Sequence, residues 1–100
     1  MSELCLTLLC PPTLEEKLLD MLLMSPEASV FTSTPTAAHG SAAGNLSAAE
    51  QVLGRAVATQ VQVLIAAKDR EAMLDTIRQQ FAGTGMRYWL APILEQGEFA

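Results

Sequence analysis

The stretch that decides the fold is VATQVQVLI, residues 57–65. Its odd-numbered positions all hold β-branched residues, while its even-numbered positions hold alanine, glutamine and leucine. Successive side chains of a strand point to opposite faces, so this period of two predicts a strand with one face buried. The chain is therefore expected to contain a β-sheet, and the other elements are assigned by how they would pack with this strand.

A second strand is predicted for residues 4–10, LCLTLLC, which Pro11 and Pro12 then stop. Leucine, cysteine and threonine occupy both of its faces, which is typical of a central strand. Helices of the same chain can cover one face, but the other face is too apolar for bulk water. We therefore expect this second face to pack between the subunits of an oligomer.

A helix is expected between Pro12 and Ser25-Pro26, ending near Met24. Thr13 and Glu16 have the spacing of a capping box at its start. Helical spacing then predicts one buried stripe, formed by Leu14, Leu18, Met21 and Leu22.

A second helix should follow residues 57–65, with Asp69 as its cap. Its buried positions recur every four residues, at Met73, Ile77 and Phe81. Gly83 and Gly85 end it, because glycine readily adopts the conformation that terminates a helix. The last strand then carries Tyr88, Trp89 and Leu90 and reaches its end or a sheet edge at Pro92.

Between the two halves, residues 30–36 are rich in valine, phenylalanine and threonine and predict a strand ending near Pro35. Residues 37–56 are mostly small or polar, which predicts a long, mobile loop with one or two helical turns at 48–53. The tail, residues 95–100, is expected to be ordered only against a partner.

The order of elements is βαββαβ, and it predicts a single α+β domain of the ferredoxin-like split βαβ class over residues 1–100. Two helices would cover one face of a four-stranded antiparallel sheet.

The charge balance excludes several kinds of partner. Six Lys and Arg against eleven Asp and Glu give a net charge of −5, so nucleic acid is not expected to bind. The longest apolar run, residues 18–24, is broken by Asp20, which argues against a membrane-embedded protein. The start Met1-Ser2-Glu3 lacks the positive region of a signal peptide, and we expect a cytoplasmic protein.

Three stretches of the sequence resemble the PII and CutA group of small signalling and ion-tolerance proteins. Residues 38–44, AHGSAAG, are similar to the opening of the family's flexible T-loop, and Gly40 matches one of its glycines. Residues 59–65 with Lys68-Asp69-Arg70 resemble its third strand and the turn into its second helix. Gly83-Thr84-Gly85 stands where the family has a B-loop that contacts nucleotide phosphates.

This resemblance implies a homotrimer with small ligands in clefts between subunits and T-loops that engage a partner. The most similar branch is a divergent one associated with heavy-metal efflux systems, so a membrane transporter or efflux component is the implied partner. An adenine nucleotide is the implied ligand. The matching ligand-binding positions are Thr32, Gly40, Gly83, Thr84, Gly85 and Arg87.

The sequence also departs from the nitrogen-regulating members of that family. Met86 replaces their phosphate-binding lysine, and the tail lacks their arginines, which leaves Arg87 as the evident cation for a triphosphate. Ser41 and Ala42 replace a basic residue and a glutamine, so binding of 2-oxoglutarate is not carried over. From spacing alone, a helix end and turn is the favoured reading of Gly83-Thr84-Gly85, and the resemblance brings the phosphate-binding reading level with it.

Two alternative functions are open at this point. Cys10 and His39 follow strands that finish at the same sheet edge, so together they are candidate ligands for a transition-metal ion, as in CutA-like relatives. A buried thiol and a solvated histidine are the plainer reading of the same two residues. A small ferredoxin-like enzyme is the other alternative, and it would show a ligand-sized pocket with converging polar groups inside each subunit. The favoured reading is a regulatory protein that is not an enzyme.

Overall fold

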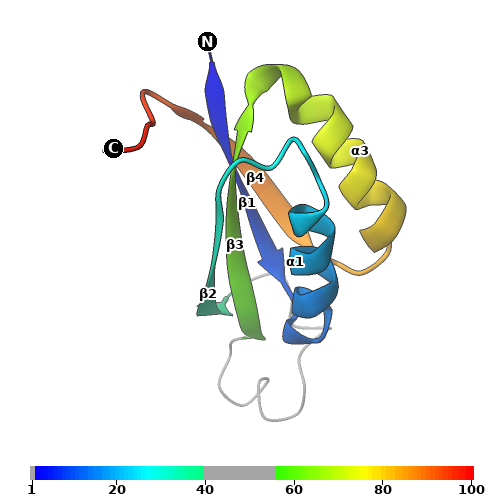
Figure 1. The fold of residues 1–100 in the computed structure, drawn as a ribbon. Helices are drawn as coiled ribbons and strands as arrows, with labels where there is room; N and C mark the ends of the chain where they lie inside the picture. Colours follow the sequence, from blue (N-terminus) through cyan, green and yellow to red (C-terminus); the bar gives the residue numbers. More distant parts are fainter. Residues whose placement is uncertain (1, 40–55) are drawn as a thin grey trace.

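The computed structural model describes residues 2–39 and 56–100. These residues form four strands and two α-helices in the order βαββαβ (Figure 1). These elements are β1 (Glu3–Cys10), α1 (Glu15–Leu23), β2 (Phe31–Ala38), β3 (Ala56–Ala66), α3 (Arg70–Phe81) and β4 (Arg87–Ile93). The predicted element order is therefore confirmed.

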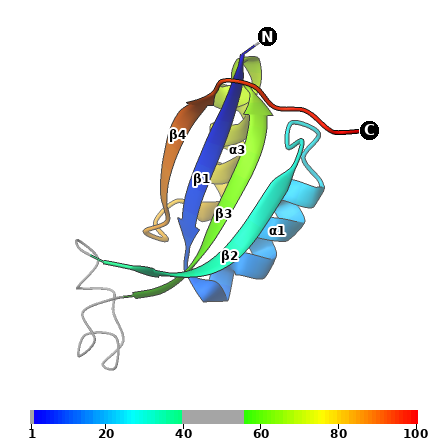
Figure 2. The same ribbon diagram turned by 90° about the vertical axis from the view of Figure 1, so that its left-hand side faces the viewer.

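The strands form one antiparallel sheet in the order β2-β3-β1-β4. Both helices lie on one side of the sheet, which separates the molecule into two layers (Figures 1 and 2). β1, which the sequence predicted as a central strand, pairs with β3 in the middle of the sheet. The ferredoxin-like split βαβ class is thus confirmed.

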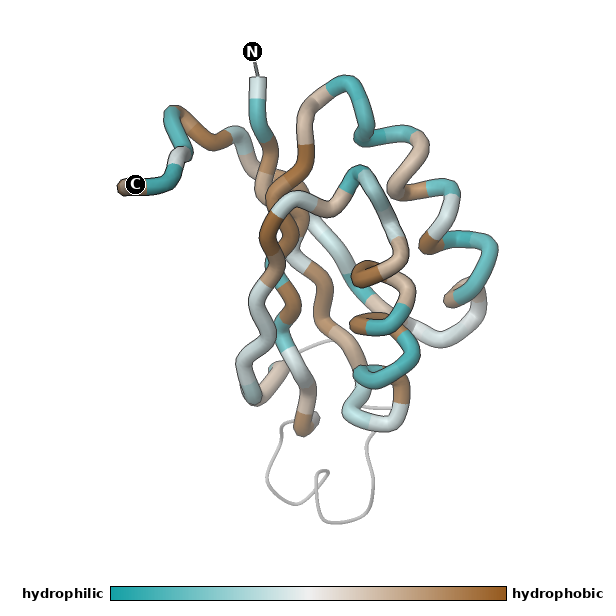
Figure 3. Tube along the Cα trace, in the orientation of Figure 1, coloured by the Kyte–Doolittle hydropathy of each residue, from teal (hydrophilic) through white to brown (hydrophobic). Residues whose placement is uncertain are grey.

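The core lies between the sheet and the helices. Leu6 and Leu8 of β1 and Val61 and Val63 of β3 are at most 1% exposed, because the apolar side of each helix packs over them. The hydropathy trace shows the brown segments turned inward, with teal segments on the outer side of α3 (Figure 3). The predicted helix stripes are buried here as Leu18, Met21, Leu22, Met73, Ile77 and Phe81, while Leu14 is half-buried.

No described helix covers the opposite face of the sheet, which is turned to the viewer in Figure 2 and is called the open face below. Register places two rows of residues across it: Thr32, Gln62, Thr7 and Trp89, and beside them Thr34, Gln60, Leu9 and Arg87. Thr7 is buried, and its Oγ1 accepts a hydrogen bond from Gln62 Nε2 at 3.5 Å. Cys5, Leu9 and Leu64 are half-buried on this face. Its apolar content is as expected from the sequence.

Both helix starts differ from the sequence prediction. A 3₁₀ turn, Pro12–Leu14, precedes α1, which begins at Glu15 with no side-chain cap, so the Thr13–Glu16 capping box is wrong. Asp69 holds the cap position of α3 but makes no side-chain cap hydrogen bond either. The turn that begins at Pro12 sets the direction in which the chain enters α1, because the φ angle of proline already matches that of a helix. A side-chain cap is not needed for this.

A lysine joins the two helices on their outer side. Lys17 Nζ of α1 donates to the carbonyl oxygen of Gln80, 3.2 Å away, and lies 5.0 Å from the centre of the Phe81 ring. This ammonium group therefore supplies a hydrogen bond to the C-terminal end of α3, where the last carbonyl groups have no partner within the helix.

The boundaries of the second strand are a further correction. β2 runs through Pro35 to Ala38, so residues 37 and 38 belong to the strand and not to the predicted loop, and residue 56 belongs to β3. Pro35 is tolerated because β2 is an edge strand of the sheet. The rest of the predicted loop, including its helical turns at 48–53, lies outside the described residues.

Residues 94–100 have no regular secondary structure and extend from the open side of the sheet (Figures 1 and 2). Gln96 Nε2 donates to Glu3 Oε1 at 3.0 Å, while Leu94 and Phe99 are fully exposed. The ordering of this tail by a partner stays a prediction.

Candidate functional site

The glycine-rich segment after α3 forms a turn held by its own threonine. Gly83 and Gly85 have φ angles of 81° and 79°, which glycine adopts without strain. Thr84 Oγ1 donates to the carbonyl oxygen of Phe81 at 2.7 Å and accepts from the amide of Met86 at 3.3 Å. The amide of Thr84 also donates to Phe81. The turn thus ends the helix, and the amides of residues 84 and 86 already have partners.

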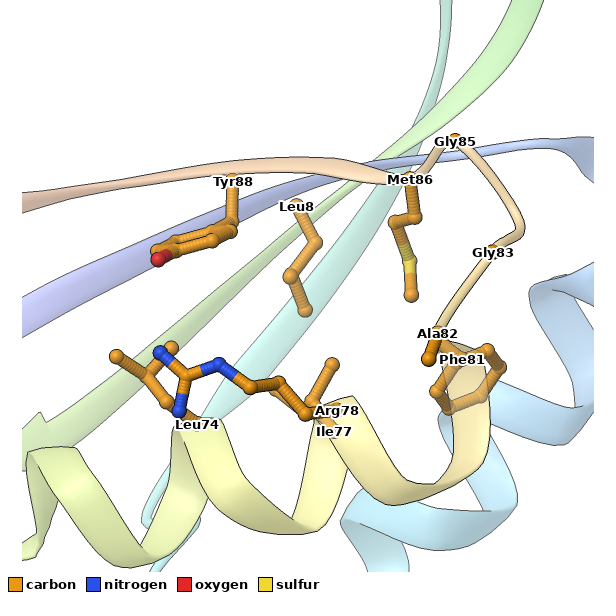
Figure 4. A pocket seen from close by; sticks show the side chains of 10 residues that line it. All are labelled: Leu8, Leu74, Ile77, Arg78, Phe81, Ala82, Gly83, Gly85, Met86 and Tyr88. Carbon is orange, nitrogen blue, oxygen red and sulfur yellow. The ribbon is translucent and has the colours of Figure 1, made fainter.

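A pocket of about 180 Å³ lies beside this turn, between α3 and the edge of the sheet formed by β4 (Figure 4). Its lining is largely apolar: Leu8, Leu74, Ile77, Phe81, Ala82 and Met86, with Gly83 and Gly85 as a wall without side chains. Arg78 and Tyr88 supply its polar groups. In Figure 4 the guanidinium of Arg78 and the hydroxyl of Tyr88 lie at one end, and Met86 and Phe81 lie at the other.

Thr32 and Arg87, two of the predicted ligand-binding residues, lie on the open face and not in this pocket. They stand on the two outermost strands, β2 and β4, three strand spacings apart, which is about 14 Å. One chain therefore does not bring Thr32 to Arg87 or to the glycine turn. Gly40 lies outside the described residues.

The candidate metal ligands are also apart within one chain. Cys10 of β1 is level with Thr59 and Pro35, whereas His39 follows β2 four residues beyond Pro35, about 13 Å further along the strand direction. Across residues 2–39 and 56–100, no three His, Cys, Asp or Glu side chains gather as a metal site would require.

The surroundings of Cys10 favour an inert thiol. Its Sγ is buried and donates to the carbonyl oxygen of Pro11 at 3.3 Å. Burial, with the nearby Glu15 carboxylate as the smaller cause, raises the pKa of this thiol from 9.0 to about 11. Glu15 itself accepts a hydrogen bond from the hydroxyl of Thr59. Because metals bind the thiolate, this environment disfavours Cys10 as a ligand at neutral pH. Cys5 lies on the opposite face, and both cysteines are free, as expected.

Sequence reasoning missed the polar residues of the pocket. Helical spacing does not distinguish Arg78 from the other polar residues of the second helix, and the strand pattern marks Tyr88 only as a member of the last strand. Tyr88 lies two residues before the half-buried Leu90, so strand alternation already placed it on the face covered by helices. That signal could have identified Tyr88, whereas its proximity to Arg78 depends on how α3 packs over β4.

The whole chain, residues 1–100, matches the family described as a protein of unknown function, DUF3240. The chain belongs to the DUF3240 family. A crystal structure of a DUF3240 family protein from Shewanella baltica OS155 is similar to this member with a TM-score of 0.82 and 17% identity. The match covers 100% of this chain and 99% of the other chain. No curated protein matches the sequence of the chain at a significant level.

Two PII-type structures share the fold of this DUF3240 protein. A PII-like protein from Thermus thermophilus has a TM-score of 0.66 and 12% identity over 93% of this chain and 88% of its own. The GlnK–ATP complex of Bacillus subtilis has a TM-score of 0.67 and 12% identity over 92% of this chain and 82% of its own. The PII-like fold is therefore established. No helix in the described part of the chain is long and apolar enough to cross a membrane.

Proposed function

We propose that this DUF3240 protein is a PII-like regulatory protein that works as a homotrimer. Each subunit pair would hold a small ligand in the cleft between them, and the segment joining β2 to β3 would engage a partner. A transporter or heavy-metal efflux component is the partner that the resemblance implies. The role given to residues 40–55 rests on the resemblance alone, because they lie outside the described residues.

The open face is the observation that carries this proposal. Its central strands present the half-buried Cys5, Leu9 and Leu64 together with the buried Thr7, and no described helix packs there. A group of apolar side chains on a sheet face that no helix of the chain covers is typical of a surface that another subunit covers. In a PII-like trimer, the two other copies of the same chain would cover this face.

The separation of Thr32 from the glycine turn supports a shared site. These two predicted ligand-binding parts stand on opposite edges of one sheet, as described above. In a closed ring of subunits, the β2 edge of one copy can approach the β4 edge of the next. Only such an arrangement would place both parts around one ligand. A metal-binding function gains no support from the positions of Cys10 and His39.

An open-face variant tests the assembly. We expect Leu64→Asp to give monomers, because three carboxylates cannot be buried together in one interface. The matched control is Leu23→Asp at the exposed end of α1, which should keep the assembly of the unmodified protein. Light scattering measures the mass, and circular dichroism checks that both variants are folded.

Trp89 provides a second readout of the same test. It is the only tryptophan of the sequence, stands on the open face and is 47% exposed in one chain. Its fluorescence should be blue-shifted in the unmodified protein and shift to the red in Leu64→Asp. Identical tryptophan spectra and masses for the unmodified protein and Leu64→Asp would show that the open face is not the interface between subunits.

A further inference from the structure

The pocket beneath α3 has the size of a single-ring ligand. Its volume is about 180 Å³, and a cavity of roughly 150 Å³ lined by leucine, isoleucine and phenylalanine takes up benzene. Leu8, Leu74, Ile77 and Phe81, the floor and the helix side of the pocket, are each at most 8% exposed. These side chains are held by the core, so the pocket is preformed and apolar in its inner part.

The polar groups of the pocket select for charge. Arg78 is its cation, and the Tyr88 hydroxyl at the same end can donate a further hydrogen bond (Figure 4). Among the described residues that line the pocket, none carries a carboxylate, so a cationic ligand would have no partner there. An anion at this end would receive charge-assisted hydrogen bonds.

Arg78 is available for this purpose although it already has one partner. Its Nη1 lies 2.9 Å from Asp75 Oδ1, and both side chains are more than half exposed. Such surface pairs contribute little to stability, and a guanidinium has five donors, so Arg78 can bind a second anion without losing Asp75. One cation supports a single negative charge better than a triphosphate.

The lining also argues for binding without chemistry. Of the described residues around the pocket, none is a histidine, cysteine, serine, threonine, aspartate or glutamate. Tyr88 is the one lining side chain of a kind that serves as a general acid, a general base or a nucleophile, and no second such group stands beside it in the described lining. The enzyme alternative expects a ligand-sized pocket with converging polar groups inside the chain, and the polar side chains of this pocket are Arg78 and Tyr88.

We propose that this pocket binds a small apolar monocarboxylate, with its ring or branched chain among Leu8, Leu74, Ile77 and Met86 and its carboxylate on Arg78 and Tyr88. Every lining residue belongs to one chain, so this binding does not depend on the proposed trimer. It adds a second ligand class to the nucleotide implied for the clefts between subunits.

The experiment uses benzoate as the probe and follows the methyl signals of the full-length protein by NMR. Benzoate should shift the methyl signals of Leu8, Leu74 and Ile77 in a saturable way. Benzyl alcohol, which lacks the charge, and acetate, which lacks the ring, should each bind about tenfold more weakly or worse.

Two arginine variants identify the cation. Arg78→Gln should weaken benzoate about tenfold and leave benzyl alcohol unchanged. Arg70→Gln is the matched control, because Arg70 is also a partly exposed helix arginine paired with a carboxylate, Glu71, and does not line the pocket. Equal weakening by both variants would overturn the role of Arg78.

Two further outcomes separate this proposal from the proposed function. Benzoate binding should persist in the monomeric Leu64→Asp variant, since the open face lies on the other side of the sheet. Absence of any saturable shift with benzoate would overturn the carboxylate pocket and leave the trimer untouched. Shifts of the same methyl signals by AMP, with none by benzoate, would assign the pocket to a nucleotide and also overturn the proposal.

Discussion

The two faces of the sheet are built from the same strands but meet different surroundings. On the covered face, Leu6 and Val63 are completely buried against the helices. On the open face, their neighbours Cys5 and Leu64 are only half-buried and contact no described helix. The first face has all the apolar contacts a stable domain needs within one chain. The second face mixes apolar side chains with threonine and glutamine and has no described helix over it, which is why we assign it to assembly.

The largest expected effect separates the faces by stability. Leu6→Ala should lower the free energy of unfolding by about 2–5 kcal/mol at every protein concentration, because it leaves a cavity in the core. Leu64→Ala should cost about 1 kcal/mol in dilute solution and more as the concentration rises, because assembly stabilises the folded chain by mass action. Urea unfolding at several concentrations measures both. Concentration-independent losses of equal size would show that the faces do not differ.

A second prediction compares the two cysteines by pH. Above pH 9 the unfolded chain releases the Cys10 proton, whereas the folded chain holds it, because the folded-state pKa of this thiol is about 11. Below pH 9 the raised pKa of Cys10 therefore makes its full contribution to the free energy of unfolding. The free energy of unfolding should then fall by about 1.4 kcal/mol per pH unit between pH 9 and 11.

Two variants assign this pH dependence to its residue. Cys10→Ala should remove the decline, and Cys5→Ala on the open face should keep it. Unfolding curves recorded across this pH range give the slopes. An unchanged slope in Cys10→Ala would mean that another group causes the decline.

The smallest expected effect concerns the polar row of the open face. Thr7→Val removes the hydroxyl that accepts a hydrogen bond from Gln62, and it should lower the free energy of unfolding by about 0.5–1.5 kcal/mol. Thr34→Val at the exposed β2 edge is the control and should change it by less than about 0.5 kcal/mol. Equal losses of stability in thermal unfolding would show that the hydrogen bond from Gln62 to Thr7 does not stabilise the fold.

The sequence predicted the fold where periodicity is set by burial. The alternation of residues 57–65 corresponds to β3 almost to the residue, because one face of that strand is buried from Thr59 to Ile65, while Val57 is exposed. The end of β2 was predicted too early, because Pro35 interrupts a central strand but not an edge strand, and edge position is a property of the whole sheet. The capping box failed because the 3₁₀ turn before α1 replaces it.

The site was less accessible to sequence reasoning. The glycine turn was located correctly as a helix end, since two glycines after an apolar stripe carry that information locally. The pocket beside it joins Arg78 of α3 to Tyr88 of β4 and Leu8 of β1, and no local pattern encodes how three separate elements pack. The ligand-binding roles of Thr32, Gly83, Thr84, Gly85 and Arg87 remain predictions.

The central claim is that copies of this chain cover the open face, and the mass in solution tests it most directly. Native mass spectrometry and light scattering of the unmodified protein at micromolar concentration should give three times the chain mass of 10.7 kDa. A particle of one chain mass, with Trp89 emission unchanged by concentration, would contradict the account.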